Sequence, residues 1–218
     1  MNRKFFFWST IFAISMGFFE SAMVIYLRTI AYPGGFSFPL HPLSSNLATT
    51  EILREVFSLI MLFSVACLLG KRGMERFAWF IYNVAIWDIF YYIFLNLLIG
   101  WPDSIFTTDL LFMIPVIWAG PVYAPVLLSL LMIFLAVPII RFSLRIRYIH
   151  FRFKEILFLS LGSVICILSF TLDSIRFSGG IIKFEPGPFN WIVFGIGSIM
   201  IFIGTLMFIV YNRKSKRK

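Results

Sequence analysis

Long apolar runs dominate this sequence, and short stretches rich in basic residues, glycine or proline separate them. A helix that crosses a hydrocarbon core of about 30 Å needs roughly 20 consecutive apolar residues. Inside lipid, each backbone N–H and C=O must find its partner within the chain, so such runs form helices. The sequence therefore predicts an all-α integral membrane protein with about six transmembrane helices in one bundle.

Composition supports this class of protein. Of the 218 residues, 60% are hydrophobic and only 13% are charged. Soluble domains, in contrast, are about half apolar and about a quarter charged. We expect one polytopic transmembrane domain over 1–218, with spans at about 5–27, 51–69, 77–99, 122–140, 155–172 and 189–211.

The stretch 109–140 does not suit a single helix. A helix of that length would measure about 48 Å, and Pro115, Pro121 and Pro125 would interrupt it. We expect a Pro-broken re-entrant or interfacial half-helix at 109–121 before the fourth span, and the alternative is that the stretch crosses twice. Irregular backbone is tolerated at membrane depth only where protein buries it or where it lines a cavity. The broken segment therefore indicates a cavity.

The basic residues indicate which way the chain crosses. They cluster at the N-terminus, in 71–76, in 141–154 and in the C-terminal tail, and the formal net charge is +9. Six crossings place all four clusters on one side, so the positive-inside rule predicts that both termini are cytoplasmic. We interpret these clusters as topology signals and lipid headgroup contacts rather than as a nucleic-acid site. The lipid bilayer is the expected partner, and a membrane-protein partner or a homo-oligomer stays open.

Acidic and phenolic side chains fall at a common depth in the outer half of this topology. At 1.5 Å per residue, Glu20 lies about 22 Å above the inner boundary and Asp88 about 18 Å above it. Glu51 and Glu55 are spaced i, i+4, so both lie on one face of the second span. The residues predicted to form a ligand- or ion-binding site in this layer are Glu20, Glu51, Glu55, Asp88, Tyr91, Tyr92 and Asp109.

Two arginines, Arg28 and Arg54, are expected to pair with these acids or to tune their pKa values. An Asp at the centre of a membrane helix costs about 2.5 to 3.5 kcal/mol, so such residues usually have a partner or a function. Full pairing would leave them a role in helix packing alone. The acids outnumber the arginines, however, and the carboxylates left without an arginine should share a proton or bind a cation. We expect Asp88 and Glu55 to be the titrating or coordinating groups, with Glu20 and Glu51 in support and with Tyr91 and Tyr92 as hydrogen-bond donors.

The sequence contains few of the patterns that are typical of cofactor-binding sites. The two histidines, His41 and His150, fall on opposite sides of the predicted membrane, which argues against a shared haem. A Walker loop and a Rossmann fingerprint are both missing from the sequence, which argues against a nucleotide. No catalytic residue can be assigned, because the sequence has no G-x-S-x-G elbow. A carboxylate-bound metal stays open, with Glu20, Glu55, Asp88 and His41 as candidate ligands.

Three functions fit this pattern. The first is transport or sensing of a cation, a proton or a small ligand at the outer-half site. The second is a membrane-embedded enzyme, with or without a metal, that acts on a lipid-soluble substrate with the same acids as general acids and bases or as metal ligands. The third is a non-catalytic subunit or assembly factor of a membrane complex.

Overall fold

The computed structural model describes residues 3–40, 43–143, 149–176 and 184–215. Within this part of the chain, six helices are long and apolar enough to cross a membrane, which confirms the predicted six-helix membrane protein. The first and fifth helices extend beyond their predicted spans at both ends and the second and third at their starts, whereas the fourth and sixth begin one or two residues later than predicted and end three or four residues later. The helices are α1 (Arg3–Ala31), α2 (Ser45–Leu69), α3 (Gly73–Ile99), α4 (Tyr123–Ser143), α5 (Phe153–Arg176) and α6 (Trp191–Ser215).

The segment 109–121 is not the half-helix that the sequence predicts. It forms a β-hairpin, in which β1 (Thr108–Phe112) pairs antiparallel with β2 (Trp118–Pro121). Asp109 lies opposite Gly120, and a bulge interrupts the register between Leu110 and Phe112. Aromatic and branched residues favour strands, and the hairpin leaves Pro115 in the connecting loop, where its missing N–H breaks no pairing. Strand pairing thus satisfies the backbone that the prolines exclude from a helix, and within 109–140 only α4 is long and apolar enough to cross a membrane.

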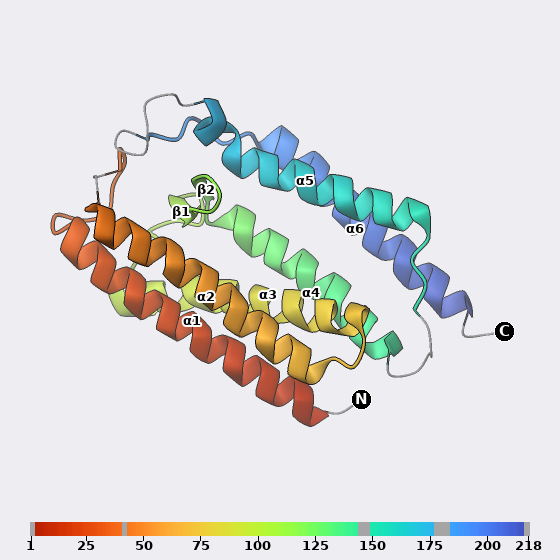
Figure 1. The fold of residues 1–218 in the computed structure, drawn as a ribbon. Helices are drawn as coiled ribbons and strands as arrows, with labels where there is room; N and C mark the ends of the chain where they lie inside the picture. The colour runs from red at the N-terminus through yellow and green to blue at the C-terminus, as the bar shows by residue number, and fades with distance from the viewer. Residues whose placement is uncertain (1–2, 41–42, 144–148, 177–183, 216–218) are drawn as a thin grey trace.

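The helices run alternately between two ends of the bundle (Figure 1). The terminal end carries the start of α1, the α2–α3 turn at 70–72 and the last turn of α6. The hairpin end carries β1, β2 and the start of α4. Helix α3 packs against α1, α2 and α4, whereas α5 and α6 form a pair that contacts the rest through α4 and the hairpin.

The contact between α1 and α3 is close and polar. A methyl group built on Gly17 would lie 2.9 Å from the carbonyl oxygen of Trp87. The Ser21 hydroxyl donates to the Tyr91 carbonyl at 2.9 Å, and the Ser9 hydroxyl donates to the Asn83 side-chain oxygen at 2.5 Å. Small residues and such hydrogen bonds are the usual means by which helices associate in lipid. This contact fixes α3, and with it the position of Asp88, against α1.

The contact between α5 and α6 depends on glycine. A Cβ built on Gly197 would lie 2.7 Å from the Cys166 sulfur and 2.8 Å from the Gly162 carbonyl oxygen. A Cβ built on Gly195, on the same helix, would meet nothing within 4 Å. Gly195 and Gly197 of α6 therefore differ in the room around them.

Substitution of these glycines tests the packing. We expect Gly197→Ala to lower the free energy of unfolding by about 1–3 kcal/mol, because overpacking displaces α5. We expect Gly195→Ala to leave it unchanged or to raise it by up to about 1 kcal/mol through helix propensity. Thermal unfolding of the detergent-solubilised variants measures both, and equal effects of the two changes would contradict this packing.

Candidate functional site

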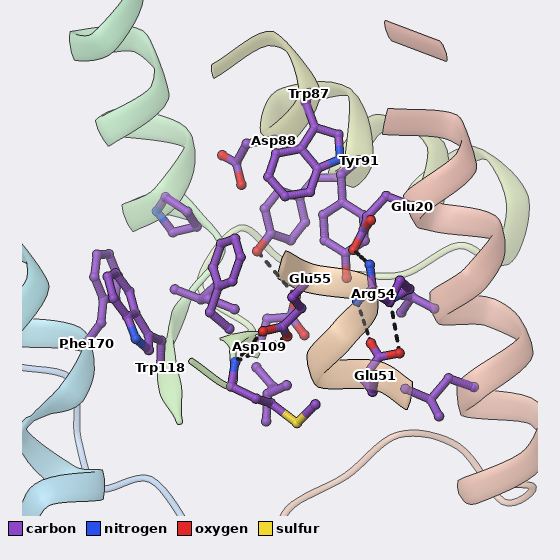
Figure 2. Close-up of a pocket in the computed structure, with 18 of the residues that line it drawn as sticks. Glu20, Glu51, Arg54, Glu55, Trp87, Asp88, Tyr91, Asp109, Trp118 and Phe170 are labelled. Atoms are coloured by element: carbon purple, nitrogen blue, oxygen red, sulfur yellow. Dashed lines mark hydrogen bonds and ion pairs between the residues drawn. The ribbon is translucent and has the colours of Figure 1, made fainter. Parts of the chain in front are cut away.

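A cavity of about 270 Å³ lies at the hairpin end of the bundle. Its walls come from α1, α2, α3, α4, α5 and the hairpin (Figure 2). All the residues that the sequence predicts for the site line this one cavity, although their role in binding stays a prediction. They are Glu20, Arg28, Glu51, Arg54, Glu55, Asp88, Tyr91, Tyr92 and Asp109.

Arg54 joins α2 to α1 through two carboxylates. Its Nη1 donates to Glu20 on α1, and its Nη2 and Nε donate to Glu51 one turn earlier on α2, the latter at 3.0 Å. The side chains of Glu20, Glu51 and Arg54 are only 9%, 12% and 12% exposed. The Ser58 hydroxyl donates to the second oxygen of Glu20 at 3.5 Å. One guanidinium thus forms ion pairs with two buried carboxylates at this wall.

Arg28 pairs with the hairpin. Its Nη2 donates to Asp109 Oδ1 at 3.0 Å, and the Tyr92 hydroxyl donates to Asp109 Oδ2 at 3.2 Å. The guanidinium carbon also lies 3.8 Å from the ring centroid of Trp101 and 4.5 Å from that of Phe36, within cation–π distance. Burial raises the pKa of Asp109 to about 6, while Arg28 opposes this shift. The ion pair holds the hairpin against α1.

Glu55 and Asp88 have neutral partners. The Met113 backbone N–H donates to both oxygens of Glu55, at 3.2 and 3.0 Å. The Ser129 hydroxyl of α4 donates to Asp88 Oδ2 at 2.7 Å. Neither acid belongs to any of the ion pairs among the described residues. These are the two acids that the sequence analysis singles out, but it identified neither Met113 nor Ser129 as a partner.

The cavity therefore carries more acid than base. Five carboxylates and two guanidiniums line it. Charges removed from water are stable only with a partner, and an uncompensated carboxylate either takes up a proton or attracts a cation. The carboxylates outnumber the guanidiniums by three, and Glu55 and Asp88 are the two that form no ion pair among the described residues.

An aromatic wall, which the sequence analysis did not assign, completes the cavity. Trp87, Phe112, Trp118 and Phe170 contact one another in that order, with ring centroids 6.1, 6.1 and 6.3 Å apart. They come from α3, β1, β2 and α5. Trp87 could have been noticed as the neighbour of Asp88 in the sequence. Trp118 and Phe170 offered no such signal, because they reach the cavity only through the tertiary fold.

The metal site considered from the sequence does not assemble among the described residues. Nowhere in them do three or more His, Cys, Asp or Glu side chains approach as a metal-binding group. Glu20, Glu55 and Asp88 instead turn to separate partners: Arg54, a backbone N–H and a hydroxyl, respectively. The fourth candidate ligand, His41, lies outside the described residues.

Comparison with protein-family models, with curated proteins and with solved structures gives no match for this chain. The cavity is the part of the molecule that bears most directly on function. Its chemistry combines three ion pairs centred on two arginines, two carboxylates with neutral partners and an aromatic wall.

Replacement of Arg54 tests the charge balance. We expect Arg54→Gln to lower the free energy of unfolding by about 3–5 kcal/mol, because it leaves Glu20 and Glu51 buried without a cation. Adding Glu20→Gln and Glu51→Gln should restore most of the loss. Arg152→Gln is the control, because the Arg152 side chain is 48% exposed and its buried partner Glu155 keeps a hydrogen bond from the Arg152 backbone N–H, so a smaller effect is expected there. Chemical unfolding in detergent measures all three, and a triple variant no more stable than Arg54→Gln would contradict the ion-pair assignment.

Proposed function

We propose that the cavity at the hairpin end binds a small cation or a proton, and that the protein transports or senses this ligand. The observation that carries the proposal is the surplus of five carboxylates over two guanidiniums around one cavity. Low dielectric strengthens the attraction between a carboxylate and a cation, and it also makes an unpaired carboxylate costly. A cation bound beside Glu55 or Asp88 would relieve the carboxylate that it contacts.

Each of these two acids connects two elements of the bundle, so ligand binding there could change how those elements are held together. Glu55 belongs to α2 and accepts from the hairpin loop, whereas Asp88 belongs to α3 and accepts from Ser129 on α4. A ligand that competes for either carboxylate would weaken a bond between two elements of the bundle. Occupancy of the cavity would thereby change how α2, the hairpin, α3 and α4 are held together, which both transport and sensing require.

We also propose that the terminal end of the bundle faces the cytoplasm, so that the cavity lies toward the outer side. Of the described acids, only Glu75 and Glu155 accompany the many basic residues at this end. Positive charge flanking membrane spans favours the cytoplasmic side. The basic residues at the terminal end are Arg3, Lys4, Lys71, Arg72, Arg76, Arg141, Arg152, Lys154 and Arg213.

Cation titrations test the proposed function. Sodium, calcium, methylammonium and tetramethylammonium chlorides are added to the purified protein at constant ionic strength, and heat of binding and proton uptake between pH 5 and 8 are recorded. We expect a response to at least one cation or to protons, and we expect Asp88→Asn and Glu55→Gln each to weaken it at least about tenfold, equivalent to about 1.4 kcal/mol. Glu75→Gln is the control, because Glu75 is a buried acid at the other end of the bundle.

The possible results of these titrations lead to different conclusions. A response that both cavity variants lose and the control keeps supports the proposal. The proposal is wrong if none of the four salts binds and proton uptake is the same in the wild type and both cavity variants. It is also wrong if a cation binds equally to all four proteins.

Cysteine labelling tests the orientation. Asp103 is exposed at the hairpin end and Lys154 is exposed at the terminal end. In a background with Cys67→Ala and Cys166→Ala, a membrane-impermeant maleimide should label Asp103→Cys in intact cells. It should label Lys154→Cys only after the cells are permeabilised. The reverse pattern would place the terminal end outside.

A further inference from the structure

The cavity has two chemically different sides. The ion pairs that Arg54 makes lie on one side, and the rings of Trp118 and Phe170 lie on the other (Figure 2). Apolar side chains extend the second side, among them Leu128 and Met132 of α4. A ligand that fills the cavity would therefore meet carboxylates at one part of its surface and rings at another.

The size of the cavity exceeds what a bare ion needs. Its volume of about 270 Å³ would hold on the order of ten water molecules at roughly 30 Å³ each. A dehydrated metal ion or a proton would leave most of this space unfilled and the aromatic wall without a contact. The volume instead suits a small organic molecule with an apolar part.

Two residues that line this space each carry a buried donor without a partner among the described residues. Among the described residues, the indole Nε1 atoms of Trp87 and Trp118 are buried and have no hydrogen-bond acceptor. Trp87 is only 6% exposed, and both residues line the cavity. Leaving a buried donor without an acceptor costs about 1–3 kcal/mol of stability, so a ligand that supplied an acceptor to one of these N–H groups would gain binding free energy. The nearby acids already accept from other groups, whereas a ligand oxygen could supply the acceptor.

We propose that the ligand of this cavity is an organic ammonium ion that has an apolar body and carries an oxygen acceptor, an inference that rests on the cation site proposed above. The ammonium group would donate to Asp88 and would lie near the rings of Trp87 and Trp118, where cation–π attraction adds to the charge pairing. The apolar body would pack against the aromatic wall. The oxygen would accept from an indole N–H.

A probe series on the unaltered protein tests this ligand class. The probes are 2-amino-1-phenylethanol, which has all three features, 2-phenylethylamine, which lacks the hydroxyl, 2-phenylethanol, which lacks the ammonium, and methylammonium, which lacks the ring. Calorimetric titration of the purified full-length chain gives each Kd. We expect affinity to fall about tenfold when the hydroxyl is removed and further when the ring is removed, and we expect no binding without the ammonium.

Three tryptophan variants localise the acceptor contact. Trp87→Phe and Trp118→Phe keep a ring but remove the indole N–H. At least one of them should weaken 2-amino-1-phenylethanol about tenfold while leaving 2-phenylethylamine unchanged. Trp79→Phe is the matched control, because Trp79 is 2% exposed and its Nε1 also has no partner among the described residues, yet it lies outside this cavity. Asp88→Asn should abolish binding of both amines.

The results distinguish this inference from the cation site beneath it. If methylammonium binds as tightly as the aromatic amines, the proposed ligand class is wrong while the cation site stands. The same conclusion follows if the hydroxyl does not change the Kd and all three tryptophan variants have the same affinities. The same holds if simple cations bind and all three aromatic probes fail. If binding of every cation survives Asp88→Asn and Glu55→Gln, both proposals fail.

Discussion

At membrane depth, where water is scarce, each polar group must find its partner within the protein, and this requirement governs the structure. Six helices satisfy it for their own backbones. The hairpin of β1 and β2 satisfies it where prolines exclude a helix, and the Met113 N–H in its loop is paired by Glu55 instead of by backbone. An acidic side chain and an irregular segment thus stabilise each other.

The same requirement divides the acids of the cavity into two groups. Glu20, Glu51 and Asp109 lie in ion pairs with Arg54 or Arg28, and these pairs connect α1 to α2 and to the hairpin. Glu55 and Asp88 accept only from neutral donors. Breaking a buried ion pair leaves an isolated charge, whereas a hydrogen bond from a hydroxyl can be exchanged for one from a ligand. The first group accordingly fits a structural role, and the second group fits ligand binding.

Close helix packing positions the cavity. Gly17 lets α1 approach the backbone of α3 at Trp87 and Tyr91, so the stretch that carries Asp88 is held rigidly against α1. Gly120 has the same effect in the hairpin, because a Cβ there would lie 2.8 Å from the Phe170 ring. Phe170 thereby reaches Trp118, and α5 contributes to a site otherwise built by the first four helices. The aromatic wall is a consequence of these two close approaches.

The sequence by itself determined the number of long apolar spans and the set of acids and arginines that meet at the hairpin end, and its basic clusters favoured a single crossing of 109–140 over two. Run length and helix rise fix these features, since both set depth along the bundle axis. Only the tertiary structure decided that 109–121 is a hairpin, that Asp88 bonds to Ser129 and Glu55 to the Met113 N–H, and that Trp118 and Phe170 complete the cavity. These features depend on how each helix is rotated about its axis, and helices that are apolar on nearly every face carry little record of that rotation in their sequence.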